Sequence, residues 1–217
     1  MNVTFEIVKN SPEIRTYITQ ADASLTALGF TEHSFAHVTK CAEVAARILT
    51  QLGYSPKEVE LAKIAAFMHD IGNVVNRHDH AISGATMAFR ILDKMGMEPA
   101  DVAAVITAIG HHDDSTAFPV NAVAAALILA DKTDVRRSRK DMATFDIHDR
   151  VNYSVERSEV LLDVPGRTVT LSLSINTQVC AVMDYFEIFL QRMLLCRRAA
   201  EALSLKFRLE INGQVLL

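Results

Sequence analysis

The sequence predicts a mainly α-helical protein, with a helical bundle followed by a small α+β unit. Between about residue 11 and residue 138, apolar residues recur at helical spacing, alanine is abundant and β-branched alternation is scarce. After about residue 140 the pattern changes to alternating strands, hairpin turns and one long apolar helix. We therefore expect a compact bundle to form the main body of the protein.

The first three predicted helices have recognisable starts and ends. In SPEI, a capping serine precedes a proline in the first turn, and Gly29 ends this helix. The second helix lies in HSFAHVTKCAEVAARILTQLG, where apolar residues form one stripe. The third, SPKEVELAKIAAFMHDIG, opens with a capping box of Ser55 and Glu58 and closes at Gly72.

Three more helices complete the predicted bundle, and they correspond to AISGATMAFRILDKMG, PADVAAVITAIG and NAVAAALILADKTDVRR. The C-terminal unit then begins with EVLLDVPGRTVTLSLSI, whose alternation and Pro-Gly turn predict a hairpin. A long helix follows in TQVCAVMDYFEIFLQRMLLCRRAAEAL, and Asn212-Gly213 predicts a second hairpin in KFRLEINGQVLL. We expect VTFEIVK, near the N-terminus, to add a strand to this unit.

These patterns predict two parts: a helical domain over residues 1–140, with its core at about 30–140, and an α+β unit over 141–217 packed on the bundle. The long helix is apolar on nearly all sides, so we expect it to be buried between bundle and sheet or in a homodimer interface. Half of the 217 residues are hydrophobic and the formal net charge is -4, which is typical of a globular protein.

Composition also limits the partners and the compartment. The mild acidity gives no reason to expect a nucleic-acid polymer or a membrane as partner. The N-terminal residues lack the pattern of a signal peptide, and the longest apolar run, AVAAALILA, is too short to span a bilayer. The three cysteines are odd in number and far apart, so a reducing cytoplasm is the expected location.

Histidine and aspartate side chains recur at the predicted helix ends or on inward helix faces. The candidates are His37, His69, Asp70, His80, His111, His112 and Asp131. Imidazole and carboxylate together suit iron, manganese, zinc or nickel, and a shared carboxylate can bridge two ions. Each residue alone has a simpler interpretation, such as a core histidine, a helix cap, a loop residue like His78 or a polar turn. Asp131 is hardest to explain in that way, because an ionised aspartate is seldom buried without a partner.

The ordered series resembles the HD-domain superfamily of metal-dependent phosphohydrolases, most closely its HD-GYP branch and stand-alone HD hydrolases. The resemblance covers about residues 30–140, and its motifs are HVTKCAEVAARILTQLGYSPKEVELAKIAAFMHDIGN, HAISG and HHDDSTAFPV. It implies one metal ion held by His37, His69, Asp70 and Asp131, and a second held by Asp70, His80, His111 and His112. It also implies that Asp70 is catalytic as the bridge, and that a metal-bridging hydroxide attacks phosphorus, with iron or manganese favoured.

The sequence departs from the family pattern at three places. Asn73 stands where the family often has a lysine that contacts substrate phosphate, and the gap from His-Asp to the next ligand is shorter than in HD-GYP domains. Ala117-Phe118-Pro119 replaces the Gly-Tyr-Pro signature, so cyclic-di-GMP hydrolysis is not the expected activity. His33 occupies a position where some members hold a third metal ion, although Glu32 or solvent are equally good neighbours for it.

A dense group of cations follows Asp131. Lys132, Arg136 and Arg137 are candidate contacts to substrate phosphate, and Asn73 is a fourth. A solvated helix end, where cations complement the helix dipole, explains the same residues without substrate.

Three functions are therefore compatible with the sequence. The first is a cytoplasmic, metal-dependent phosphohydrolase or phosphodiesterase acting on a nucleotide or another small phosphate ester. The second is a di-iron oxygenase, because some HD proteins use the same ligand order to oxidise C–H bonds. The third is a non-catalytic ligand-binding or scaffold protein with the α+β unit as its interaction surface.

Overall fold

A computed structural model describes residues 3–29, 35–114, 117–135 and 147–216, without the side chains of residues 148 and 149. The chain divides into two compact units, Met1–Asp131 and Lys132–Leu217. The boundary predicted near residue 140 lies outside the described residues. The prediction of a mainly α protein with a small C-terminal α+β unit is confirmed.

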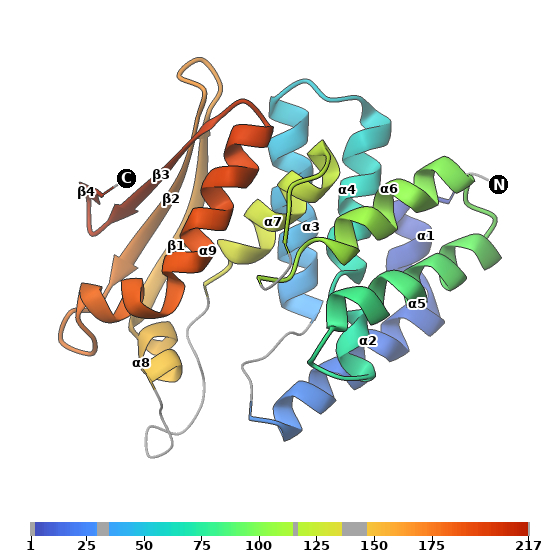
Figure 1. Ribbon diagram of the computed structural model, residues 1–217, viewed down its shortest axis with the longest axis horizontal. Coiled ribbons are helices and arrows are strands. Elements are labelled where there is room, and N and C mark those ends of the chain that lie inside the picture. Colours follow the sequence, from blue (N-terminus) through green and yellow to red (C-terminus); the bar gives the residue numbers. More distant parts are fainter. Residues whose placement is uncertain (1–2, 30–34, 115–116, 136–146, 217) are drawn as a thin grey trace. The chain divides into compact units, whose positions relative to one another are not determined.

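The first unit is helical (Figure 1). Its elements are α1 (Phe5–Asn10), α2 (Pro12–Ala27), α3 (Phe35–Gln51), α4 (Pro56–Met68), the 3₁₀ helix η1 (Ile71–Val74), α5 (His80–Lys94), α6 (Pro99–Gly110) and α7 (Ala122–Lys132). The predicted capping box is present at the start of α4: Ser55 and Glu58 satisfy each other's backbone N–H groups. Large apolar side chains fill the core, among them Leu25, Ile48, Ile64, Phe67, Leu92 and Leu127.

The strand predicted at VTFEIVK is wrong, because these residues form helix α1. Phe5 and Val8 lie one turn apart and are both buried, and Thr4 caps the helix. The backbone N–H of Phe5 donates to the carboxylate of Glu60 on α4, and the Phe5 ring packs edge-on against Phe67 at 5.7 Å. Through these contacts with α4, the segment packs as part of the helical bundle.

Helix α4 ends at Met68, earlier than the predicted end at Gly72. The chain turns at Asp70 (φ -96°, ψ 1°) and continues as η1. Gly72 is required here because a Cβ at this position would overlap the carbonyl oxygen of His80 and the backbone nitrogen of Gly84. A Cβ on Gly84 would in turn lie 3.2 Å from the carbonyl oxygen of His69. The two glycines let η1 and α5 lie against each other.

The second unit contains α8 (Ile147–Ser154), β1 (Val155–Asp163), β2 (Thr168–Ile175), α9 (Val182–Ala202), β3 (Lys206–Ile211) and β4 (Gln214–Val215). The strands form one sheet in the order β1-β2-β3-β4. Both predicted hairpins are present, and Asn212 and Gly213 make the second turn with φ of 52° and 79°. Strands β2 and β3 are parallel, with α9 as their connection.

Helix α9 buries one face rather than its whole circumference. The buried residues include Tyr185, Phe189, Met193, Cys196 and Ala200, which recur every three or four positions. On other faces, Met183 is 73 % exposed and Leu190 is 45 % exposed. The expectation of burial on several sides is therefore too broad for this helix within the unit.

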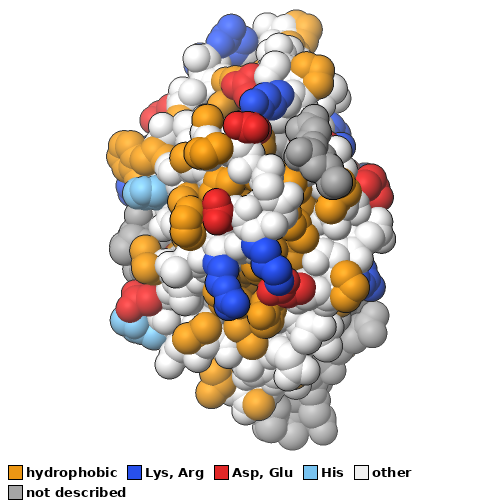
Figure 2. All heavy atoms as spheres, turned by 90° about the vertical axis from the view of Figure 1, so that its right-hand side faces the viewer, with side chains coloured by type: hydrophobic (Ala, Val, Ile, Leu, Met, Phe, Trp, Pro, Cys, Tyr) orange, Lys and Arg blue, Asp and Glu red, His pale blue; other side chains and the backbone are white. Residues whose placement is uncertain are grey.

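Figure 2 shows the face that looks to the right in Figure 1, where hydrophobic side chains lie among charged side chains of both signs. Such a mixture does not produce a field of one sign. Within the described ranges, no helix combines the length and the apolar character that crossing a bilayer requires.

The close approach at Gly72 predicts a graded effect of alanine substitutions. We expect Gly72→Ala to lower the free energy of unfolding by about 3 kcal/mol or more, because backbone atoms rather than flexible side chains block the added methyl group. Gly84→Ala meets backbone atoms at 3.2–3.3 Å and is expected to have a smaller effect. Urea unfolding followed by circular dichroism measures both.

Gly110→Ala is the matched control, because its Cβ would meet only the Cβ of Ala85, at an ordinary 3.8 Å. This helical position should be neutral, or more stable by up to about 1 kcal/mol. Equal stability of the Gly72 and Gly110 variants would contradict the packing described here.

Candidate metal centre

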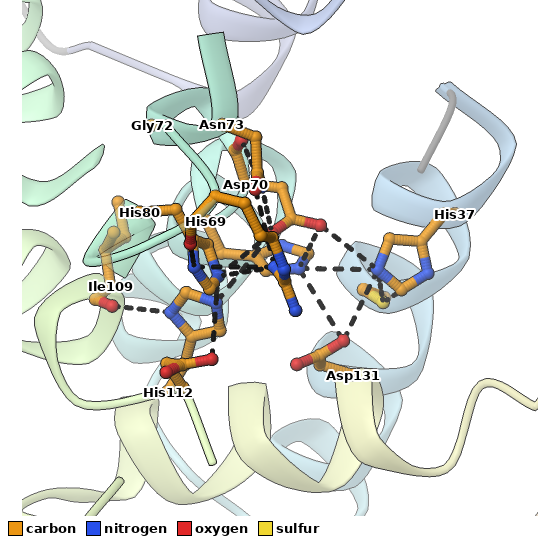
Figure 3. Close-up of polar contacts among 12 residues, drawn as sticks. His37, His69, Asp70, Gly72, Asn73, His80, Ile109, His112 and Asp131 are labelled. Atoms are coloured by element: carbon orange, nitrogen blue, oxygen red, sulfur yellow. Dashed lines mark hydrogen bonds and ion pairs between the residues drawn. The ribbon is translucent and has the colours of Figure 1, made fainter. Parts of the chain in front are cut away.

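Five helices of the first unit bring six ionisable side chains together (Figure 3). The cluster consists of His37 from α3, His69 and Asp70 after the last residue of α4, His80 at the start of α5, His112 after α6 and Asp131 from α7. All are buried except Asp131, which is half-buried. Burying so many ionisable groups is unfavourable unless they share charge or hold a cation.

Backbone carbonyls orient three of the histidine rings. His69 Nδ1 lies 2.7 Å from the carbonyl oxygen of Ala66, and His112 Nδ1 lies 2.6 Å from that of Ile109. His80 Nδ1 lies 3.1 Å from the carbonyl oxygen of Arg77. Because a carbonyl only accepts, each Nδ1 must carry the proton that is donated. Each Nε2 then faces the cluster, as in histidines that bind metal ions.

Asp70 lies between two pairs of histidines, and each of its oxygens faces one pair. Its Oδ2 is 3.2 Å from His69 Nε2 and 3.7 Å from His37 Nε2. Its Oδ1 is 3.4 Å from His80 Nε2 and 3.9 Å from His112 Nε2. A carboxylate in this arrangement can bridge two cations, with one oxygen on each. We call the two sides the His69 half and the His80 half.

The His69 half contains a second carboxylate. Asp131 Oδ1 is 3.4 Å from His37 Nε2 and 3.7 Å from His69 Nε2. Burial alone would lower the pKa of His69, but Asp70 and Asp131 outweigh it and raise this pKa to about 10. The two carboxylates therefore favour positive charge beside His69 Nε2.

The His80 half has a different charge balance. Burial lowers the pKa of His80 and Arg77 adds to this effect, whereas Asp70 and Asp113 oppose it. The ring nitrogens His80 Nε2 and His112 Nε2 lie 3.2 Å apart. Since each ring donates through Nδ1, two lone pairs meet at this point, an arrangement that needs a proton or a cation to be favourable.

The donor atoms fit divalent transition metals. Three groups of ligand atoms within this cluster lie within 4.8 Å of one another: His37, His69 and Asp70; His69, His112 and Asp131; and Asp70, His80 and His112. Imidazole nitrogen with carboxylate oxygen is a donor set for iron, manganese, zinc or nickel. A cation would also compensate the two carboxylates and the opposed lone pairs. The structure thus brings together six of the seven predicted ligands.

The remaining predicted site residues lie differently. His111 is the residue after α6 and belongs to none of the described groups of ligand atoms, so its role as a ligand stays a prediction. His33, Arg136 and Arg137 lie outside the described residues. Lys132 is buried at the end of α7.

Asn73 is also buried, and its side chain is directed at Asp70. Its amide nitrogen Nδ2 donates to Asp70 Oδ1 at 2.9 Å and to the Asp70 carbonyl oxygen at 3.0 Å. These bonds fix the orientation of the bridging carboxylate. The structure therefore gives Asn73 a contact with Asp70, whereas its predicted contact with substrate stays untested.

Two residues beside the cluster were not predicted from the sequence. Arg77 Nη1 lies 3.2 Å from His80 Nε2, and Asp113 Oδ1 lies 3.9 Å from the same nitrogen. Asp113 directly follows the His-His pair, which is a signal that sequence reasoning could have used. Arg77 lies in the loop before α5, where no periodic pattern indicates the direction of a side chain.

Comparison with known proteins found a matching family and a similar solved structure. The profile of the HD domain matches residues 34–187. Among solved structures, the chain is similar to a crystal structure of a predicted HD superfamily hydrolase from an uncultured Thermotogales bacterium. The two are 27% identical with a TM-score of 0.47, over 61% of this chain and 74% of the other. No curated protein matches the chain.

The position of Asp70 predicts how two conservative substitutions differ. Asp70→Asn should weaken both cation-binding events by at least about 100-fold, because both halves lose a charged oxygen. This loss of affinity is larger than the one usually seen when a residue that only supports a metal ligand is replaced. Asp131→Asn should weaken only the event in the His69 half. Isothermal titration with Mn²⁺ measures each event. Asp93→Asn, at an exposed position of α5, is the control. An Asp70→Asn variant with wild-type affinities would show that Asp70 does not bridge two cations.

The contact of Asn73 with Asp70 generates a second expectation. Asn73→Ala should weaken cation binding by about 10–100-fold, because Asp70 loses the hydrogen bond that orients it. Asn76→Ala is the matched control, since Asn76 is exposed and accepts from the backbone of His78 instead. The same titration measures both variants, and identical affinities would show that Asn73 has no orienting role.

Proposed function

The chain belongs to the HD domain family, and on that premise we propose that it is a phosphohydrolase or phosphodiesterase that uses two divalent transition metals. The family membership supports a metal-dependent hydrolase in the broad sense. A nucleotide or another small phosphate ester is the proposed substrate. Iron or manganese is the favoured metal, and zinc or nickel would suit the same donors.

The observation that carries this proposal is the division of the Asp70 oxygens between two histidine pairs. Bound divalent cations would supply Lewis acidity, activate a water molecule and neutralise phosphoryl oxygens. The residues of the chain position the ligand atoms for these cations. Asp70 links the two halves, Asn73 orients it, and the Nδ1–H donors keep each Nε2 directed at the centre.

The charge of the cluster suits an anionic substrate. Asp70 and Asp131 are its carboxylates, and a histidine that gives its Nε2 lone pair to a cation is uncharged. Two divalent cations would therefore leave the centre positively charged, which favours a phosphate ester over a neutral ligand. Lys132, Arg136 and Arg137 remain our proposed additional contacts to phosphate.

A cysteine-based mechanism fits the structure less well. Cys41 Sγ lies 3.7 Å from His37 Nδ1, so a cysteine–histidine pair is present. Cys41, however, is fully buried, and a substrate could not reach its sulfur without unfolding of the surrounding core. The pair is better explained as packing beneath the metal centre.

We also make proposals for the partners of the protein and for its location. We propose a small-molecule phosphate as the ligand, with neither a nucleic-acid polymer nor a membrane as partner, in a cytoplasmic protein. A homodimer would cover the exposed apolar residues of α9, such as Met183 and Leu190.

A substrate screen tests the proposed activity. The protein loaded with Mn²⁺ or Fe²⁺ is incubated with phosphomonoesters, nucleotides and cyclic dinucleotides in H₂¹⁸O. We expect hydrolysis of at least one compound with one ¹⁸O atom in the product phosphate group, detected by mass spectrometry. Asp70→Asn should lose this activity because both halves lose a ligand.

The other outcomes separate the remaining candidates. Oxygen consumption by the iron-loaded protein, without hydrolysis of any phosphate ester, would reject the proposal in favour of a di-iron oxygenase. A fully metal-loaded protein that neither hydrolyses phosphate esters nor consumes oxygen would point to a ligand-binding or scaffold protein.

A further inference from the structure

The side chain of Arg77 reaches into the His80 half of the cluster. Its guanidinium nitrogen Nη1 lies 3.2 Å from His80 Nε2 and 3.4 Å from Asn73 Oδ1. Its own backbone carbonyl accepts from His80 Nδ1 at 3.1 Å. The same Nη1 lies 3.4 Å from His80 Nδ1, so the guanidinium stands over the face of the His80 ring and also reaches the amide that orients Asp70.

These contacts place the Arg77 charge beside a position that a cation could use. Since His80 Nδ1 donates to the carbonyl of Arg77, Nε2 carries the ring's lone pair. A donor in line with this lone pair would lie much farther from Nδ1 than from Nε2, so the guanidinium does not occupy it. A cation held by Asp70, His80 and His112 would use the same lone pair. That cation and the Arg77 guanidinium would then both lie close to His80 Nε2 and repel each other.

The neighbouring charges set the strength of this repulsion. The Arg77 guanidinium brings a positive charge to the place where a second cation would bind. Asp70 Oδ1, at 3.4 Å from the same His80 nitrogen, would be shared with the cation. Asp113 Oδ1, 3.9 Å from His80 Nε2, adds a second carboxylate to this half, and the Arg77 charge offsets it. The His69 half combines two carboxylates with His37 and His69, and these carboxylates favour positive charge there.

We propose that Arg77 is an internal cation that weakens the binding of a metal ion in the His80 half. Resting on the two-cation centre proposed above, this makes the two positions unequal. The His69 half fills first, and the His80 half fills only at a higher metal concentration, because the Arg77 charge repels the second ion. Arg77 thus determines the metal occupancy of the centre and is not itself a ligand.

The test is a titration of the purified full-length protein with Mn²⁺, in which electron paramagnetic resonance counts the free aquated ion. The wild type should bind one ion tightly and a second at least about tenfold more weakly, because the Arg77 charge repels the second ion. Arg77→Met, which keeps the length of the chain but removes the charge, should tighten only the second event, by about tenfold.

Two further variants complete the experiment. Arg77→Lys keeps the positive charge without the guanidinium fork, so its second affinity should lie between those of the wild type and Arg77→Met. Arg90→Met removes an exposed arginine from α5 and should leave both affinities unchanged. Circular dichroism of each variant verifies the fold.

The outcomes separate this inference from the function on which it rests. Two equal affinities in the wild type, or an unchanged second affinity in Arg77→Met, would overturn the role of Arg77 and leave the two-metal centre intact. Failure of the wild type to bind any Mn²⁺, Fe²⁺, Zn²⁺ or Ni²⁺ would overturn both.

Discussion

Asp70 is a buried carboxylate whose two oxygens face different histidine pairs, and the arrangement of the first unit follows from that constraint. One carboxylate can serve both sides only if ligands from separate helices converge on it within about a hydrogen-bond distance. Helices α3 and α5 and the residues that follow α4 and α6 must therefore end or pass beside the same point. The bundle provides this convergence, which no single helix could.

Residues at helix ends orient several of the side chains around Asp70. The last carbonyls of a helix lack intrahelical partners, and here those of Ala66 in α4 and Ile109 in α6 accept from His69 and His112. One set of bonds thus completes two helix termini and orients two imidazoles. Gly72 and Gly84 contribute by letting η1 lie against α5. The glycines of this region therefore have a steric role beside the metal-binding chemistry.

The two halves of the cluster differ in how their charge is balanced. Asp131 adds negative charge beside His69, whereas beside His80 the positive charge of Arg77 offsets the carboxylate of Asp113. A cation is consequently expected to gain more in the His69 half than in the His80 half. We therefore expect such a centre to bind two metal ions with different affinities, even though a single carboxylate connects the two positions. The chemistry proposed for the protein depends on both positions being filled.

The sequence by itself determined the helical class, most helix boundaries and both hairpins, because spacing, capping and turn residues are local signals. It also identified six residues of the cluster, since their order resembles one family. Only the tertiary structure decided the rest. Phe5 joined a helix because it packs on α4. Asn73 and Arg77 meet Asp70 and His80 because η1 and the loop before α5 turn them there, and neither of these short segments has a periodic pattern that indicates the direction of a side chain. Which oxygen of Asp70 faces which histidine is a property of the packed helices alone.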